Sequence, residues 1–352
     1  MIYLICQTWT NTSNNHAGIK YLCNRLQEMY PDLYYCYCIP DYYVQINRNF
    51  LLRKLQYAFV QMKYHGKMKS IIKDIQIRMS SCDKVFLMEY MELLYPQLYM
   101  AKQIKRLFPD IPVYAMIHLV PAILERNFNN KSFFYWMNSV DKIFTLGTSL
   151  TTYLVKRGYD SSKIVTTFHY ADIEYYQRPY NDGKFLLKII AMGNQMRNIS
   201  LLRSIVESNR EALFVICQGV SDMSSYFCGM DNVLLIPYVA EHELKNYMSM
   251  CDVSLNIMYD TIGSNVIVTS MSMGLAMICS DVGSIHDYCD DSNCIFCNNE
   301  ELESFATAVK TLTCNHQRVE LMKMASRAKA EQLSIENFSN QIQKLEKVSL
   351  NI

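Results

Sequence analysis

A glycine–serine pair in the second half of the chain has the spacing of an anion-binding turn. Gly263 and Ser264 precede an uncharged, mostly apolar stretch that predicts a helix from Asn265 to Met273. The first N–H groups of a helix have no carbonyl partner within it, and the helix dipole favours negative charge there. Gly263, Ser264, Asn265 and Val266 are therefore a candidate phosphate-binding turn. The alternative is an ordinary strand-to-helix turn capped by Ser264.

The same region contains twenty consecutive uncharged residues, from Thr261 to Ser280. That length approaches what a membrane-spanning helix requires. Small and polar residues make up nearly half of the run, however, and Gly274 divides it at a natural helix end. The stretch therefore predicts a buried helix followed by a buried strand, from Leu275 to Cys279.

Arg197 is a candidate partner for the same anion. It lies four residues after Gly193, which follows a predicted strand. A planar guanidinium can donate two parallel hydrogen bonds to a phosphate group. The alternative is a solvated surface arginine near the start of a helix, where most arginines are found.

An acid and three histidines are candidates for binding hydroxyl groups or exchanging protons with them. Asp260 follows a predicted strand and either accepts hydrogen bonds from a ligand or simply ends that strand. His118 follows an apolar strand, and its alternative is a hydrogen-bonded core residue. His16, in the turn after the first strand, and His169, near the end of the first half, are further candidates of this kind.

The composition is that of a globular protein large enough for two domains. Half of the 352 residues are apolar, and the formal net charge of +1 gives no general attraction to nucleic acid. The apolar start, MIYLICQTW, lacks a basic region before it, so we expect a first strand and not a signal peptide. We therefore expect a cytoplasmic protein whose 13 cysteines are buried free thiols.

No bound metal is expected. The sequence has no HExxH motif, no DxD at a strand end and no dense group of carboxylates. Cys36 and Cys38 lie on one face of a predicted strand, and Cys294 and Cys297 form a lone CxxC pair. Neither pair has the repeated spacing of a zinc site.

Short apolar runs alternate with longer helical patterns, which is typical of βαβ units and parallel sheets. The predicted strands are Ile2–Cys6, Leu33–Cys38, Lys84–Met88, Val113–Ile117, Lys142–Leu146, Ile164–Phe168, Leu187–Ala191, Leu213–Cys217, Val233–Ile236, Val253–Ile257, Leu275–Cys279 and Cys294–Phe296. The turn-rich stretch over 177–184 is the best linker candidate. We predict an α/β protein with two tandem Rossmann-like, doubly wound domains, over 1–176 and 185–330. The last fifty residues predict helices, and the one over 331–352 is expected to pack back on the first domain.

The second half of the chain resembles the retaining GT-B glycosyltransferases, specifically glycosyltransferase family 4, also called group 1. "IIAMGNQMRNISLL" is similar to the strand, glycine and basic position that open the family's donor domain. "ALFVICQG" is similar to its second strand, and "NVLLIPYVAEHELKNYMSMCDVSLNIM" to the segment that meets the nucleotide base. The stretch "DTIGSNVIVTSMSMGLAMICSDVGS" follows in the family's order of acid, glycine turn, helix, glycine and strand.

The first half carries a fainter resemblance, in "NNHAGIKYLCNRL", "YAMIHLVP" and "SKIVTTFHYADIEYY". The resemblance implies a nucleotide-sugar donor, a metal-free reaction and a GT-B fold. It implies a donor site made of Gly193, Arg197, Gly219, Tyr238, Gly263, Ser264, Asn265 and Val266. It also implies catalytic roles for His118 and Asp260 and acceptor-side roles for His16, Gly18 and His169.

The chain departs from the family at a pair of acids. The family usually carries two glutamates, Glu-x7-Glu, across the glycine turn and the helix that follows it. If Gly263 fixes the alignment, Asp260 and Val268 take these places; if Gly274 fixes it, Thr261 and Thr269 take them. Neither alignment supplies two acids that could hold the nucleotide ribose.

A basic segment lies in the first half, with eight basic residues and one acid from Arg48 to Arg78. Its apolar residues Met68, Ile71, Ile72, Ile75 and Met79 follow helical spacing, which predicts a core-facing stripe with a solvated basic face. The alternative is a helix that lies on an anionic membrane surface. Its lipid-facing cations would be Arg53, Lys54, Lys63, Lys67, Lys69 and Lys73.

Together these features predict a glycosyltransferase for bacterial surface polysaccharide synthesis, peripheral on the inner face of the cytoplasmic membrane. The second domain would bind the nucleotide-sugar, and the first would bind a glycan or lipid-linked acceptor. Two alternatives stay open: a nucleotide-sugar epimerase, which needs well-placed acids, and a non-catalytic sugar- or partner-binding subunit. Nucleic acid is not expected as a partner, because no recognition fold accompanies the basic segment.

Overall fold

The computed structural model describes residues 1–9, 15–42, 49–92, 97–178, 187–193, 196–219 and 221–349. It divides into two compact units. Unit 1 comprises Met1–Leu146 and Leu150–Thr167, and unit 2 comprises Gly147–Ser149 and Phe168–Ile352. The division after Thr167 precedes the predicted linker over 177–184, of which 179–184 lie outside the described residues.

Unit 1 is built on a six-stranded parallel sheet with the strand order β2-β1-β3-β4-β5-β6. Its strands are β1 (Ile2–Gln7), β2 (Tyr34–Ile39), β3 (Lys84–Tyr90), β4 (Val113–Ile117), β5 (Lys142–Thr145) and β6 (Ile164–Thr166). The helices of this part of the chain are α1 (Ile19–Met29), α2 (Phe50–Arg78), α3 (Gln97–Leu107), α4 (Pro121–Asn127), α5 (Asn130–Met137) and α6 (Thr148–Lys156), followed by the short 3-10 helix η1 (Ser161–Lys163). Because parallel strands all end at one edge of the sheet, the residues that follow β1, β3 and β4 are neighbours there.

Unit 2 repeats this plan with a second six-stranded parallel sheet, in the order β12-β11-β10-β7-β8-β9. Its strands are β7 (Lys188–Ala191), β8 (Leu213–Cys217), β9 (Val233–Ile236), β10 (Val253–Asn256), β11 (Ala276–Ser280) and β12 (Cys294–Cys297). Its helices are α7 (Ile199–Ser208), α8 (Ser224–Phe227), α9 (Glu241–Ser249), α10 (Asn265–Ser272), η2 (Ile285–Asp287), α11 (Leu302–Thr313), α12 (His316–Gln332) and α13 (Ile335–Ser349). The central strands are apolar and buried, as strands of a parallel sheet covered on both faces must be.

The predicted architecture is confirmed: each unit is a parallel sheet with helices, and helices α11 to α13 end the chain. Each predicted strand corresponds to an observed strand whose ends differ by no more than about two residues, the usual uncertainty of such boundaries. The uncharged run in unit 2 is the buried helix α10 followed by β11. Within the described ranges, no helix has both the length and the apolar character needed to cross a bilayer.

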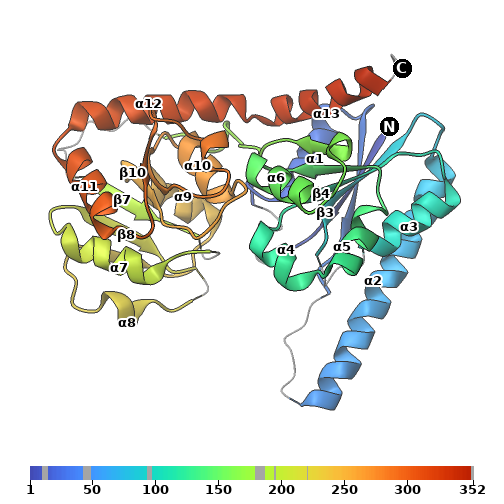
Figure 1. The fold of residues 1–352 in the computed structure, drawn as a ribbon, viewed down its shortest axis with the longest axis horizontal. Coiled ribbons are helices and arrows are strands. Elements are labelled where there is room, and N and C mark those ends of the chain that lie inside the picture. The colour runs from blue at the N-terminus through green and yellow to red at the C-terminus, as the bar shows by residue number, and fades with distance from the viewer. Residues whose placement is uncertain are drawn as a thin grey trace. The chain divides into compact units, whose positions relative to one another are not determined.

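Helix α2 has two different halves. In its second half Met68, Ile71, Ile72 and Ile75 are buried, so the predicted core-facing stripe is confirmed for these four residues. The fifth predicted member, Met79, lies just after the end of the helix and is half-buried. The first half extends beyond the rest of unit 1 (Figure 1) and leaves large apolar side chains exposed. These side chains belong to Phe50, Leu51, Leu52, Leu55, Tyr57, Phe59 and Met62.

Candidate functional site

The turn that opens α10 has the geometry expected of an anion-binding helix start. Ser264 caps the helix, with its side chain accepting a hydrogen bond from the N–H of Ile267 at 3.3 Å. The N–H groups of Asn265 and Val266 belong to the first turn, where the helix itself offers no carbonyl. They point out of the positive end of the helix dipole and can donate to a bound anion.

Gly263 is required at this turn for two reasons. Its φ of +100° lies in the left-handed region, which favours glycine, and a Cβ there would lie 2.1 Å from the hydroxyl oxygen of Tyr288. That hydroxyl accepts a hydrogen bond of 2.8 Å from the backbone N–H of His169. Tyr288 thus fixes the turn against the segment that contains His169.

His169 lies in unit 2, beside the first residue of α10. Its ring is buried, interacts with the side chain of Asn265, and contacts the carbonyl oxygen of Tyr170 through Nδ1 at 3.1 Å. Burial lowers the pKa of His169 to about 4, so the ring is neutral at physiological pH. The resemblance implied an acceptor-side role for His169; the structure groups this residue with the donor-side turn.

Arg197 is a half-buried cation next to the same turn. Its Nη1 donates to the carbonyl oxygens of Gly193, at 3.3 Å, and Cys217, at 3.0 Å. Gly193 in turn adjoins α10, since a Cβ at this glycine would lie 3.1 Å from Cγ2 of Val266. Burial lowers the pKa of Arg197 to about 10, which still leaves it charged at pH 7. The alternative interpretation of a solvated surface arginine is therefore wrong.

The second terminal nitrogen of Arg197 is unsatisfied. Nη2 is buried and has no hydrogen-bond partner in the part of the chain that the structure describes. A buried charge without a partner is costly, and native proteins rarely keep one unless a ligand satisfies it. Arg197, Gly193 and the first turn of α10 thus form one donor-rich group suited to a phosphate.

The other donor-side candidates follow strands of the same sheet. Gly219, with φ of +63°, follows β8, whose last residue, Cys217, contacts Arg197. Tyr238 follows β9 and is largely exposed. Asp260 follows β10, accepts a hydrogen bond from the N–H of Thr261 at 2.8 Å, and has a pKa raised by burial.

Helix α10 carries no carboxylate at the places where the family has its second acid. Val268 and Thr269 are both buried on the helix, and the Thr269 hydroxyl donates to the carbonyl oxygen of Asn265 at 2.5 Å. At the position of the family's first glutamate, one alignment places the acid Asp260 and the other places Thr261, which is not an acid. Both alignments considered from the sequence therefore leave α10 without the second acid.

In unit 1, His118 lies just beyond the carboxyl end of β4. Its Nε2 is 2.8 Å from the carbonyl oxygen of Met88 in β3, so this nitrogen carries the proton and donates. His16 packs its ring against Tyr21 at a centroid distance of 4.4 Å, and Gly18 is the N-terminal cap of α1. His118 and the His16–Gly18 turn both follow strands of the same sheet, in loops at its carboxyl ends.

Glu89 is a residue of this edge that the sequence analysis missed. It lies in β3, and its carboxyl group accepts hydrogen bonds from the N–H of Gln7, at 2.5 Å, and from Nε1 of Trp9. Burial raises the pKa of Glu89 to about 7. The available signal was a single acid inside the apolar run of the strand, "KVFLMEY". Its hydrogen bonds fix Trp9, which is half-buried at the carboxyl end of β1.

A group of three thiols was also missed, because its members come from two strands. The Sγ atoms of Cys6, Cys36 and Cys38 lie within 4.8 Å of one another. It is the one such group of potential metal ligands among the described residues. Cys36 and Cys38 share a face of β2, as predicted, but the sequence did not reveal that β1 adds Cys6 to them.

Comparisons with known proteins identify a domain within unit 2. Residues 192–315 match the family model described as "Glycosyl transferases group 1". A search of curated proteins finds no match.

Solved structures resemble the whole chain. Sucrose-phosphate synthase from Thermosynechococcus elongatus is 10% identical, with a TM-score of 0.75 and 100% of both chains covered. HepE from Anabaena in complex with UDP-glucose is 10% identical, with a TM-score of 0.69, covering 98% of this chain and 99% of that one. The lipopolysaccharide outer core galactosyltransferase WaaB, in its apo form, is 13% identical, with a TM-score of 0.66 and coverages of 97% and 99%. Identities this low show the fold alone.

The fold is that of the GT-B glycosyltransferases, and unit 2 carries the group 1 domain. Residues 192–315 therefore match a domain of the group 1 glycosyltransferases, enzymes that take a sugar from a nucleotide-sugar donor.

Proposed function

We propose that the chain transfers a sugar from a UDP-sugar to a lipid-linked glycan during the assembly of a bacterial surface polysaccharide. The choice of UDP is supported by HepE, whose structures contain UDP, UDP with glucose, or UDP-glucose. The choice of acceptor class is supported by WaaB, described as a lipopolysaccharide outer core galactosyltransferase. Retention of the anomeric configuration is expected from the resemblance to family 4.

One observation carries the donor proposal: the buried Nη2 of Arg197 has no partner among the described residues. The donor diphosphate would accept hydrogen bonds from this nitrogen and from the N–H groups of Asn265 and Val266. Arg197 and the helix dipole would then offset the two negative charges that the protein must hold. Gly263 lets the turn pack against Tyr288, and Gly193 lets its own segment approach Val266 of α10 closely.

The same contacts would lower the barrier to transfer. The diphosphate gains negative charge as the bond to the sugar breaks, so fixed donors aimed at it stabilise the transition state more than the ground state. Asp260 would accept hydrogen bonds from donor hydroxyls. His118, which Nε2 holds against Met88, would lie near a sugar hydroxyl at the carboxyl end of β4.

A thermal-shift panel of UDP-, GDP-, ADP- and CMP-sugars tests the donor class. A donor at about 100 times its dissociation constant adds about 2.7 kcal/mol to the free energy of unfolding. We expect a shift with UDP-sugars that disappears in Arg197→Ala and persists in Arg203→Ala, an exposed arginine of α7 paired with Glu207. A shift confined to another nucleotide would overturn the choice of UDP, and no shift with any donor would overturn the donor site.

The absence of a second acid on α10 favours one alternative, a donor-binding subunit without turnover. The buried Val268 and Thr269 carry no carboxylate that could accept hydrogen bonds from ribose hydroxyls, as a glutamate would. Release of UDP from a UDP-sugar, measured with a lipid-linked acceptor extract, separates the two functions. Donor binding without UDP release would support the subunit, and release dependent on the acceptor extract would support the transferase.

The first half of α2 supports a peripheral position on an anionic membrane. Leu51 and Leu55 are 69% and 68% exposed, which is unusual for leucine in a folded protein. The nearby Arg53, Lys54 and Lys63 are exposed too, and the helix has no acidic residue before Asp74. A helix that combines apolar and basic side chains in this way fits an anionic lipid surface. A second copy of the same basic helix would be repelled by like charge.

Sedimentation with lipid vesicles tests this position. We expect binding to vesicles that contain phosphatidylglycerol and little binding to pure phosphatidylcholine. Replacing Arg53, Lys54 and Lys63 by Gln should weaken binding by about two orders of magnitude, at about 1 kcal/mol for each charge. Leu51→Ser with Leu55→Ser should also release the protein, whereas Ile77→Ser, exposed at the other end of α2, should not. Equal binding to both lipids, or none, would contradict the proposal.

A further inference from the structure

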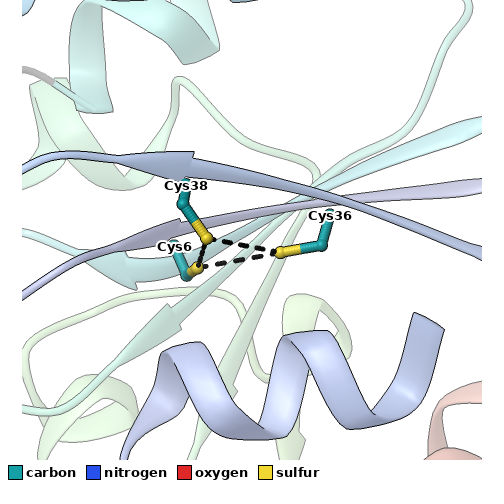
Figure 2. A group of neighbouring side chains, drawn as sticks. All are labelled: Cys6, Cys36 and Cys38. Carbon is teal, nitrogen blue, oxygen red and sulfur yellow. Dashed lines mark hydrogen bonds between the residues drawn. The ribbon is translucent and has the colours of Figure 1, made fainter. Parts of the chain in front are cut away.

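The thiols of Cys6, Cys36 and Cys38 form a compact triangle in unit 1 (Figure 2). Parallel pairing of β1 with β2 places Cys6 directly opposite Cys38. Cys36 precedes Cys38 by two residues and therefore points to the same face of the sheet. The Sγ–Sγ distances are 3.4 Å from Cys6 to Cys38, 3.8 Å from Cys36 to Cys38 and 3.9 Å from Cys6 to Cys36.

A fourth cysteine approaches the triangle from α1, which packs on β1 and β2. Cys23 lies in this helix, is fully buried, and interacts with the thiols of Cys6 and Cys36. The four cysteines thus come from three successive elements of the chain, β1, α1 and β2. The edge of the group is accessible to an ion, because Cys36 and Cys38 are only half-buried.

The spacing of the three thiols matches that of a metal centre. Zinc–thiolate bonds are about 2.3 Å long, so two sulfur ligands of a tetrahedral site lie about 3.8 Å apart. The observed distances, from 3.4 to 3.9 Å, bracket this value. A disulfide needs about 2.05 Å between its sulfur atoms, so no pair of the three is bonded.

We propose that Cys6, Cys36 and Cys38, with Cys23 as the fourth ligand, bind one zinc ion in unit 1. Thiolate sulfur is the ligand that structural zinc sites use most, and four sulfur atoms close the coordination sphere. The ion would tie α1 to the first two strands of the sheet. It lies among cysteines of the acceptor-side unit, separate from the donor turn of unit 2, and its role is structural.

Metal analysis of the full chain, purified under reducing conditions and dialysed against a weak chelator, tests the proposal. We expect about one zinc ion per chain. Replacement by cobalt should give the thiolate-to-metal charge-transfer band and the visible bands of a tetrahedral sulfur site. Cys36→Ser with Cys38→Ser should abolish both signals, and Cys23→Ala should weaken them. Cys82→Ser, which alters an exposed cysteine outside the group, should leave them unchanged.

A second measurement avoids dependence on the folding of the variants. In the wild-type protein, bound zinc should protect the four cysteines from alkylation, and a strong chelator should expose them. Mass spectrometry of the alkylated peptides identifies each cysteine. A chain that binds neither zinc nor cobalt and whose four thiols react alike with and without chelator would overturn the proposal. So would a disulfide among them in the freshly purified protein, or zinc that is lost in Cys82→Ser.

Discussion

Glu89 should make the protein less stable as the pH rises from acid to neutral. Its carboxyl group is buried at the edge of the unit 1 sheet, and burial raises its pKa from 4.5 to about 7. Between these two values the folded protein holds a proton on Glu89 that the unfolded chain has lost. The stabilisation from this proton is complete below the unfolded pKa and is lost as the pH rises through the folded pKa.

The size of the effect follows from the two pKa values. A difference of about 2.5 pKa units corresponds to about 3 kcal/mol, at 1.36 kcal/mol for each unit. Glu89→Gln removes the titration but leaves one of the two donors, Gln7 N–H or Trp9 Nε1–H, facing an amide that cannot accept from it. That loss costs about 1 to 3 kcal/mol at every pH. The variant should therefore be less stable in acid and approach the wild type near neutral pH.

Urea unfolding of both proteins at steps from about pH 5 to about pH 8 measures the effect. The difference in free energy of unfolding between wild type and Glu89→Gln should shrink by about 2 to 3 kcal/mol over this range. Glu28→Gln, at an exposed position of α1, should run parallel to the wild type. If the curves for Glu89→Gln and the wild type were also parallel, Glu89 would not hold a proton in the folded protein and the argument would fail.

Three further substitutions test individual elements. Gly66→Ala should raise the free energy of unfolding by about 0.5 to 1 kcal/mol in urea titrations. Gly66 lies within α2, and a Cβ added there would meet no atom within 4 Å. A destabilised variant would contradict this. Gly263→Ala should weaken UDP binding at least about tenfold in calorimetric titrations, because the turn must shift away from Tyr288. Gly66→Ala is the matched control. Unchanged affinity of Gly263→Ala would show that the turn does not bind the nucleotide. Asn232→Ala should lower the melting temperature, because the free energy of unfolding falls by about 1 to 3 kcal/mol. The buried Asn232 amide donates to the carbonyl oxygens of Val206, Asn209 and Ala212. An unchanged melting temperature would show that these hydrogen bonds do not stabilise the fold.

The strands and the donor turn were predictable because each depends on local sequence. Apolar runs bounded by polar turns define β7 to β12, and Gly263, Ser264 and Gly274 mark the ends of α10 and of the stretch before β11. The sequence also made Arg197 a candidate phosphate ligand, by its distance from Gly193. It did not reveal that Nη2 of Arg197 is buried and has no partner among the residues described, since burial depends on how β7, β8 and α10 meet.

The missed features depend on which strands are neighbours. Cys6 meets Cys38, and Glu89 meets Gln7, only because β1 lies between β2 and β3 in the sheet. These residues are separated by more than thirty positions in the chain, and no local pattern records their contact. The two halves of α2 were likewise merged in the prediction, because helical spacing identified the buried stripe and gave no measure of how far the helix extends from the sheet.

The most direct test of the central claim compares UDP with uridine in calorimetric titrations of the wild type and of Arg197→Met. Methionine removes the guanidinium without leaving an unpaired charge, so the variant should fold. The account predicts that the variant binds UDP about 10 to 100 times more weakly, as expected for the loss of a charged hydrogen bond, and binds uridine unchanged. Equal losses for both ligands, or no loss for UDP, would contradict a diphosphate site at Arg197 and the first turn of α10.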